Sequence, residues 1–338
     1  MKNKTKGAII DLCALVLWAA LFVVLVFYAQ NELGEKLINA ILFSVIGLAL
    51  NYTLCVAFHE TGHLIFAKAN KMRAVKINFG FLSIDYTEKS RLKLFTFFGE
   101  NAGESNFLPT EKVTEKVVKC VALGGILFNA IYFIAVVVVI LVVKNPVLFC
   151  LFGAGGVPAG YLLTVNAIPL DKTADGAVLI SKKGYARACA NISEMQRQIQ
   201  AEKAPIFEEY IKKSSQPLDV YCDFLRLATT DAKKALSRLN GLKNGFDFTA
   251  QEYELIFPEM LFNACIGGFL NEELINRAEN FFSQETKVLS QIRAHYAYRK
   301  ARGEAEWANA IFGEYQNGLK TATEFEREVE INLINLLD

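Results

Sequence analysis

The first half of the chain contains four long stretches with almost no charged residues, and these restrict the folds open to it. A helix needs roughly 20 apolar residues to cross a bilayer, because it rises by only about 1.5 Å per residue. Each stretch reaches that length, so the sequence predicts four transmembrane helices and an all-α, polytopic membrane protein. The stretches are Ala8–Gln30, Leu37–Ala67, Cys120–Val143 and Pro146–Leu170.

The second and fourth stretches have features of their own. Leu37–Ala67 is 31 residues long, more than one crossing requires, which predicts a helix that tilts, extends into the cytosol or breaks near Asn51. The fourth stretch is rich in glycine, which lets two helices approach closely in lipid and would equally suit a cavity wall. Its glycines are Gly153, Gly155, Gly156 and Gly160.

Positively charged residues gather on one side of the four predicted helices. Three lysines precede the first helix, and ten Lys or Arg residues lie in Lys68–Lys119, between the second and third helices. The other two connections hold one lysine each. Because cytosolic loops are enriched in Lys and Arg, we expect a multi-pass protein of the cell membrane whose N-terminus, long loop and C-terminal half are cytosolic.

Composition excludes several classes of protein. The 36 Lys and Arg residues against 35 Asp and Glu residues leave a formal charge of +1, so no general positive field indicates a nucleic-acid partner. Seven scattered cysteines, none in a CxxC pair, indicate reduced thiols and no disulfide framework. With only three histidines, a site built from three imidazole ligands is not expected.

The loop between the second and third predicted helices contains a strand pattern. Apolar residues alternate with other residues in Val75–Phe81 and again in Arg91–Leu94. A period of two is typical of strands, so the sequence predicts a short cytosolic β-hairpin within Val75–Phe98. The polar, glycine-containing stretch Gly99–Thr110 is predicted to be a mobile loop.

The segment His59-Glu60-Thr61-Gly62-His63 carries the clearest chemical signal. Histidines four residues apart lie on one face of a helix and can both present a nitrogen to one metal ion. Glu60 is placed to take a proton from an attacking water and pass it to a leaving amine. Zinc suits two imidazoles and a carboxylate with an open fourth position, so the segment predicts a zinc site.

Two buried, hydrogen-bonded histidines would give the same pattern without a metal. Three ionisable side chains within five residues are costly in a bilayer, however, unless they pair with other groups or bind an ion. The apolar sequence on both sides of the segment therefore favours the metal site over two structural histidines.

A zinc site with two histidines needs a third protein ligand. His295 lies in a charged segment that is expected to form a soluble helix, so a carboxylate is required. Asp171 and Asp175 both follow Pro169, which ends the fourth predicted helix at the same membrane level as the end of the second. The residues alone leave both aspartates open as ligands.

These residues resemble the site-2 protease family of intramembrane zinc metalloproteases. The family combines an HExxH helix with a later Asn-x-x-Pro segment that leads to Asp-Gly, here His59–His63 followed by Asn166–Gly176. The resemblance covers roughly Leu37–Leu179. It implies the zinc ligands His59, His63 and Asp175, the acid/base Glu60, and Asn166 as the residue that holds substrate or the developing oxyanion.

The match to the family pattern is not complete. A Gly-Pro-x-x-Asn stretch of the family corresponds to Gly125–Asn129, where Ile126 replaces the proline and the asparagine is either a helix–helix contact or a site residue. Asp175 lies further from Asn166 than in many relatives. Asp171 therefore stays a competitor for the third ligand position.

From about Lys182 onward the charge density rises and no long apolar run recurs. This change predicts a membrane-embedded protease domain at 1–181 and a cytosolic helical domain at 182–338. Alanines and aromatic residues around 296–308 resemble a tetratricopeptide hairpin, whose surface would suit a cytosolic regulator or a substrate's tail. The predicted helical segments are Ala204–Lys213, Leu218–Thr229, Ala250–Ala264, Glu272–Phe282, Lys287–Ala301 and Glu304–Tyr315.

The family resemblance implies a zinc-dependent endopeptidase that cleaves a membrane-anchored protein in or near its transmembrane segment. Such a substrate must unwind first, because a transmembrane helix satisfies its own peptide bonds. The predicted hairpin either offers an edge strand to the unwound segment or only anchors the loop at the membrane interface. Membrane proteases with a downstream glutamate ligand are disfavoured by the Asn166–Gly176 segment. A non-proteolytic adaptor or degenerate protease that binds partners through the helical domain is the alternative, and the intact Glu60 argues against it.

Overall fold

The computed structural model divides into two compact units, residues 1–190 and 191–338. It describes residues 2–80, 82–86, 91–94, 103–169, 174–180, 184–242, 248–283 and 288–337. The units are defined by how the chain packs, and the predicted functional division between residues 181 and 182 stays a prediction.

Four helices of the first unit are long and apolar enough to cross a membrane, as the sequence predicts. Their large apolar side chains, such as Leu17, Ile38 and Leu141, are exposed on the outside of the bundle. Lipid contact explains that exposure, because a bilayer solvates apolar groups. The spans are Ala8–Asn31 within α1 (Lys2–Asn31), α2 (Leu37–Ala69), α3 (Glu115–Val142) and the composite helix Pro146–Ala167.

The second span, α2, is one unbroken helix, so the alternative of a break near Asn51 is wrong. The Asn51 amide donates to the backbone oxygens of Gly47 at 2.7 Å and Leu151 at 2.8 Å, and the hydroxyl of Tyr132 donates to its Oδ1 at 2.7 Å. The buried asparagine is therefore satisfied without bending the helix. At about 1.5 Å per residue α2 is about 50 Å long, well above a hydrocarbon thickness of about 30 Å.

The fourth span is irregular, whereas the sequence predicts one continuous helix. It begins as α4 (Pro146–Leu148), widens into a π-helix at Phe149–Gly153, tightens into a 3₁₀ turn at Ala154–Gly156 and continues as α5 (Val157–Ala167). Close packing against α2 accompanies the irregularity, because a Cβ on Gly155 would lie only 2.6 Å from the Cα of Gly47. The predicted role of the glycines in close helix approach is confirmed at Gly155, Gly156 and Gly160, where a Cβ would lie 2.6 Å or less from an atom of another helix.

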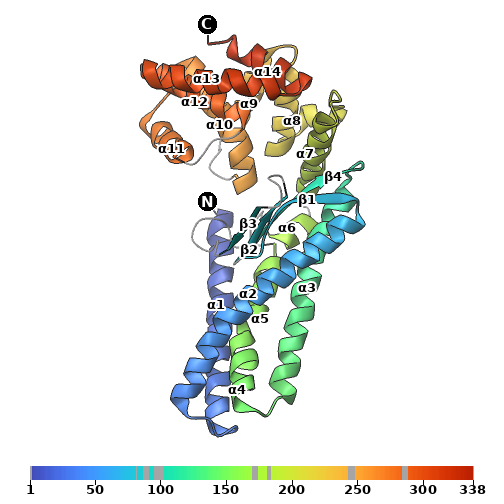
Figure 1. Ribbon diagram of the computed structural model, residues 1–338, viewed down its shortest axis with the longest axis vertical. Coiled ribbons are helices and arrows are strands. Elements are labelled where there is room, and N and C mark those ends of the chain that lie inside the picture. Colours follow the sequence, from blue (N-terminus) through green and yellow to red (C-terminus); the bar gives the residue numbers. More distant parts are fainter. Residues whose placement is uncertain are drawn as a thin grey trace. The chain divides into compact units, whose positions relative to one another are not determined.

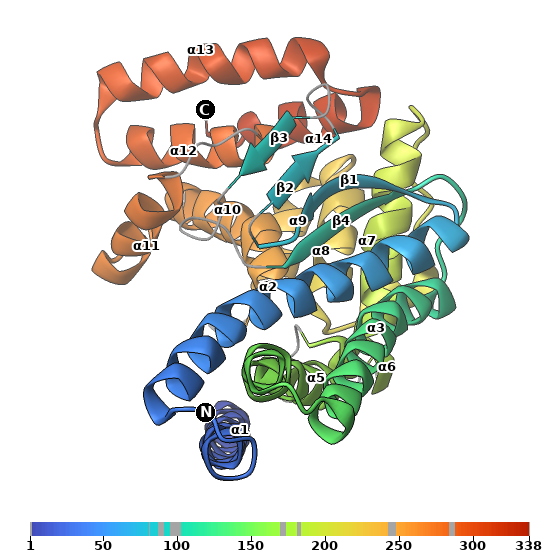
Figure 2. The same cartoon turned by 60° about the horizontal axis from the view of Figure 1, so that its bottom comes forward.

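The helices of the first unit pack around α5. Figure 2 looks along the bundle and shows α5 among α1, α2 and α3, all three of which it contacts. The helices α2 and α3 approach most closely at Gly62, where a Cβ would lie 2.3 Å from the backbone oxygen of Gly124. At such a separation, side chains of α2 can reach the backbone of α3.

A four-stranded antiparallel sheet follows α2 directly (Figure 1). It contains β1 (Met72–Asn78), β2 (Leu82–Asp85), β3 (Arg91–Leu94) and β4 (Glu104–Pro109) in the order β3-β2-β1-β4. The two stretches of the predicted hairpin form the strands β1 and β3, but they do not pair with each other, because β2 lies between them and pairs with both. The predicted mobile loop at Gly99–Thr110 is wrong where β4 forms, because residues of β4 pair with β1, a non-local contact that short sequence patterns do not reveal.

The second unit is helical, as predicted, although some bounds differ. The predicted helix Ala204–Lys213 forms only a short 3₁₀ turn at Glu209–Lys213, and α7 (Tyr185–Gln200), α9 and α14 have no predicted counterpart. The likeness of this unit to tetratricopeptide repeats stays a prediction. Its helices are α8 (Pro217–Ala228), α9 (Ala232–Leu239), α10 (Ala250–Gly267), α11 (Glu272–Phe282), α12 (Leu289–Ala301), α13 (Ala305–Thr321) and α14 (Glu324–Ile334).

A fully buried arginine joins three helices of the second unit. The guanidinium of Arg293 donates to both oxygens of Glu259 at 2.8 and 2.7 Å and to Glu330 at 2.8 Å. It also lies 4.4 Å from the centre of the Phe262 ring. Burial raises the pKa of Glu259 to about 7 and raises that of Glu330, although both carboxyls face this cation. One positive charge is therefore shared by two buried carboxyls, whose raised pKa values favour keeping a proton on the pair.

We expect Arg293→Met to destabilise the second unit by about 3–5 kcal/mol, because it leaves two buried carboxyls without a cation. Arg302→Met is the matched control, since the ion pairs of Arg302 with Glu279 and Glu304 lie at the surface, and it should change little. Pulse proteolysis of the purified full chain in urea, read on the region after residue 190, measures both effects. Equal stability of the two variants would contradict the expectation.

Candidate metal centre

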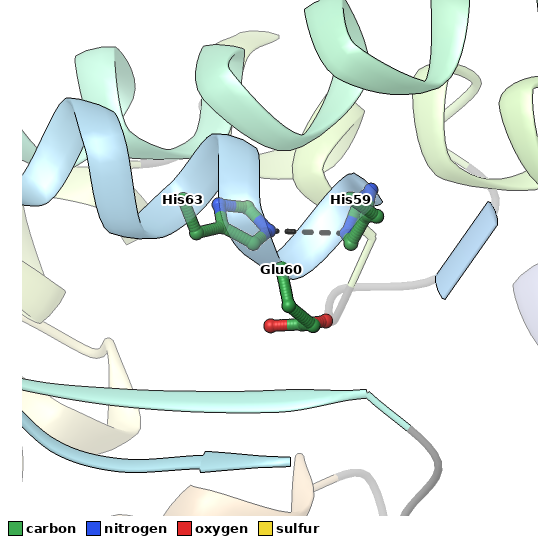
Figure 3. A group of neighbouring side chains, drawn as sticks. All are labelled: His59, Glu60 and His63. Carbon is green, nitrogen blue, oxygen red and sulfur yellow. Dashed lines mark hydrogen bonds between the residues drawn. The ribbon is translucent and has the colours of Figure 1, made fainter. Parts of the chain in front are cut away.

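Two histidines of α2 turn their Nε2 atoms toward a common point. The Nε2 atoms of His59 and His63 are 3.0 Å apart, and the ring planes are nearly perpendicular at 89°. Figure 3 shows Glu60 projecting from the turn between them. The three side chains can offer ligand atoms that all lie within 4.8 Å of one another.

Asp175 reaches the same point from α6 (Asp175–Ile180). Its Oδ2 lies 3.2 Å from His59 Nε2 and 3.3 Å from His63 Nε2, and this buried oxygen accepts no hydrogen bond from a described residue. Gly176 permits the approach, because a Cβ there would lie 2.1 Å from the backbone oxygen of Ala167. Only glycine allows α6 to start so close to the end of α5.

The three atoms form a triangle of a size that fits a tetrahedral metal ion. Bonds of about 2.0 Å to a tetrahedral zinc ion place its ligand atoms about 3.3 Å apart. The observed sides are 3.0, 3.2 and 3.3 Å. Two imidazole nitrogens and one carboxylate oxygen with an open fourth direction are also the donor set of a catalytic zinc site.

The two carboxylates at this site need a compensating positive charge. Glu60 and Asp175 bring two carboxylates into a bundle of apolar helices, and imidazoles that offer lone pairs are neutral. No lysine or arginine within the described part of the chain forms an ion pair with either carboxylate. Because isolated buried charges are costly, a divalent cation would balance the two acids.

The helix α3 packs directly against the two imidazoles of the site. A Cβ on Gly125 would lie 2.6 Å from His59 Cε1 and 2.6 Å from His63 Nε2, so the imidazole pair occupies the space that glycine leaves. His63 Nδ1 contacts the backbone oxygen of Val121 at 2.9 Å, and Asn129 contacts His59 Nδ1 at 3.0 Å. Asn129 is thus at the same time a contact between helices and a neighbour of the site.

The strand β4 covers Glu60, a contact that the sequence does not suggest. The hydroxyl of Ser105 donates to Glu60 Oε2, and Gly103 lies so close that a Cβ would be 2.9 Å from Glu60 Oε1. Gly103 has a φ of +86°, which favours glycine. The sequence does not predict the contact between Ser105 and Glu60, because the pattern of Gly99–Thr110 indicates a loop. The only local signal is Gly103.

The remaining predicted site residues lie as follows. Asn166 is in the last turn of α5, where its backbone oxygen would be 3.1 Å from a Cβ on Gly176, so the turn carrying Asn166 packs against the start of α6. Asp171 lies outside the described residues. His295, excluded as a ligand from the sequence, stacks on Phe282 within the second unit with ring centres 4.1 Å apart, and burial lowers its pKa to about 4.

A pair of imidazoles, a carboxylate and a neighbouring acid among membrane-length helices define the class of site expected of a membrane metallopeptidase. The family model for peptidase family M50, the site-2 protease family, matches residues 47–297. The chain belongs to this family. The match confirms the predicted resemblance and continues beyond Leu179, into the second unit. Neither the curated proteins nor the solved structures gave a match.

We expect Gly125→Ala to weaken zinc binding by about 10–100-fold, the range for residues that orient metal ligands, because the new methyl group displaces both imidazoles. Gly153→Ala is the matched control in the same unit, since its Cβ would meet only the side chains of Ile140 and Phe149, at 3.3 Å or more, so that a shift of a few tenths of an ångström makes room for it. Zinc per chain after dialysis against a graded chelator measures both variants. Wild-type affinity in Gly125→Ala would show that the imidazoles do not need this space.

Proposed function

We propose that the protein is a zinc-dependent endopeptidase that hydrolyses a peptide bond in or near the transmembrane segment of a membrane-anchored protein. The triangle of His59 Nε2, His63 Nε2 and Asp175 Oδ2 among apolar helices carries the proposal. Membership of peptidase family M50 supports it, since this is a family of zinc metalloproteases. Placement of the N-terminus and of the helical second unit in the cytosol is part of the proposal and follows from the distribution of Lys and Arg.

The residues of the site have different roles in the proposed hydrolysis. His59, His63 and Asp175 would hold zinc, which polarises the scissile carbonyl and makes water more acidic when it is bound. Glu60 takes a proton from the attacking water as the C–O bond forms, and it passes that proton to the amine nitrogen as the C–N bond breaks. The products are a carboxylic acid and an amine, and Glu60 ends as it began.

Asn166 would stabilise the substrate in this scheme. Its amide nitrogen is a donor, and a carbonyl oxygen that gains negative charge during attack binds donors more strongly than the starting carbonyl does. Its position at the end of α5, packed against the start of α6, supports a role beside Asp175.

The unwound substrate would pair with β4. A helix must lose its internal hydrogen bonds before a peptide bond can be attacked, and a sheet edge can satisfy the freed groups. Among the described strands, β3 and β4 lie at the two edges of the sheet, and β4 touches Glu60 through Ser105. We therefore propose β4, rather than a strand of the predicted hairpin, as the docking edge.

The adaptor alternative has less support. A protein that only binds partners has no need for an acid beside a metal centre, yet Glu60 is present and buried with only 4% of its surface exposed. A cytosolic regulator on the helical unit stays compatible with the protease function and is proposed as an additional partner.

We expect Glu60→Gln to abolish cleavage and to retain zinc, because the amide cannot take a proton but leaves the three ligands in place. The control is Glu111→Gln, a carboxylate outside the site. Fragments of membrane proteins in cells that carry wild type or either variant reveal the cleavage, and metal analysis of the purified proteins reveals the zinc. Residual turnover by Glu60→Gln would exclude this residue as the acid/base.

We expect Asp175→Ala to lose zinc and Asp171→Ala to keep it. The reason is that Asp175 Oδ2 completes the triangle with the two imidazoles. Purified wild type should hold about one zinc per chain, measured by atomic absorption. The opposite result for the two aspartates would transfer the ligand role to Asp171.

A further inference from the structure

Each imidazole of the metal centre has a second ring nitrogen, Nδ1, that faces α3. His63 Nδ1 lies 2.9 Å from the backbone oxygen of Val121. A carbonyl oxygen can only accept a hydrogen bond, so Nδ1 of His63 carries the hydrogen and its Nε2 keeps a lone pair. The backbone of α3 therefore holds His63 in the tautomer that binds a metal through Nε2.

His59 Nδ1 meets a side chain. In the structure the Asn129 Nδ2 atom lies 3.0 Å from His59 Nδ1, and its Oδ1 atom lies 3.4 Å from the Cys55 sulfur, from which it accepts. Asn129 and Cys55 are both 0% exposed, so bulk water cannot replace either contact. The end of the amide that faces His59 then influences which ring nitrogen carries the hydrogen.

Chemistry selects one of the two orientations of this amide, whose ends have the same shape. The structure places Nδ2 toward His59, and in that orientation the imidazole must accept at Nδ1 while the hydrogen on Nε2 points into the ligand triangle. Turning the amide over exchanges Nδ2 and Oδ1 without changing its shape. With Oδ1 toward His59, Nδ1 donates, Nε2 keeps its lone pair, and the amide nitrogen faces the Cys55 sulfur, a weak acceptor. Only the second orientation leaves Nε2 free to bind a metal.

We propose that Asn129 is a positioning residue whose side-chain oxygen accepts the Nδ1 hydrogen of His59 and so keeps Nε2 available to the metal. The role rests on the proposed zinc site. Val121, Gly125 and Asn129 are four residues apart on one face of α3, and each serves the imidazole pair in a different way. Val121 offers a carbonyl, Gly125 leaves room and Asn129 offers an amide oxygen.

Two substitutions at one position separate this role from packing. Asn129→Leu removes the acceptor but fills the space with an apolar group, and we expect zinc affinity to fall by about 10–100-fold. Asn129→Asp keeps an acceptor for His59 and places a second oxygen near the Cys55 thiol, so we expect wild-type affinity or tighter binding. Competition between the purified full chain and a chelator of known zinc affinity gives each dissociation constant, independently of any peptidase assay.

Asn51→Leu is the matched control, because it removes another buried asparagine of the bundle that contacts neither imidazole. Its zinc affinity should equal that of wild type. Circular dichroism and gel filtration establish that each variant is folded, and Asn129→Thr, a smaller acceptor with an expected intermediate affinity, replaces Asn129→Asp if that variant does not fold.

Two results would overturn the role of Asn129: wild-type affinity in Asn129→Leu, or equal losses in Asn129→Leu and the acceptor variant. The failure of the proposed function looks different, because wild type itself would then bind no zinc. Zinc binding by wild type together with unchanged binding by Asn129→Leu would overturn only the positioning role.

Discussion

Burial of ionisable groups away from water is the constraint on which the first unit depends. One turn of α2 carries His59, Glu60 and His63 among helices whose outer surfaces are apolar, so each polar atom needs a partner from the protein or from an ion. The contact of α2 with α3 makes such partners available, since at Gly62 the two backbones are too close for any side chain between them. The bundle is held together by small residues at the level where its polar residues are grouped.

The irregular fourth span positions Asp175, the carboxylate that approaches the two imidazoles from another helix. Its π-helical turn, Phe149–Gly153, includes Leu151, whose backbone oxygen accepts a hydrogen bond from the Asn51 amide of α2 at 2.8 Å. The helix then ends at Ala167, shortly before Pro169, as expected where a proline cannot continue a helix. The chain can therefore turn back and begin α6 against the end of α5, which carries Asp175 to the two imidazoles.

The two units treat buried acids in different ways, and the contrast bears on function. In the second unit, Arg293 lies between Glu259 and Glu330 and pairs with both from within the protein. In the first unit, neither Glu60 nor Asp175 pairs with a lysine or an arginine among the described residues. A structural network supplies its own counter-charge, whereas a site with two acids and two neutral imidazoles is suited to an external divalent ion.

Local patterns in the sequence were sufficient for much of this description. Uncharged stretches gave the membrane-length helices, and the spacing of His59 and His63 gave the imidazole pair, because helical periodicity alone puts residues four apart on one face. Neither Asp175 nor the cover that Ser105 forms over Glu60 follows from such periodicity. Both depend on contacts between residues far apart in the chain: α6 must dock against α5, and β4 must pair with β1. Only the tertiary structure determines that the oxygen atoms of Asp175 and Ser105 lie beside His59, Glu60 and His63.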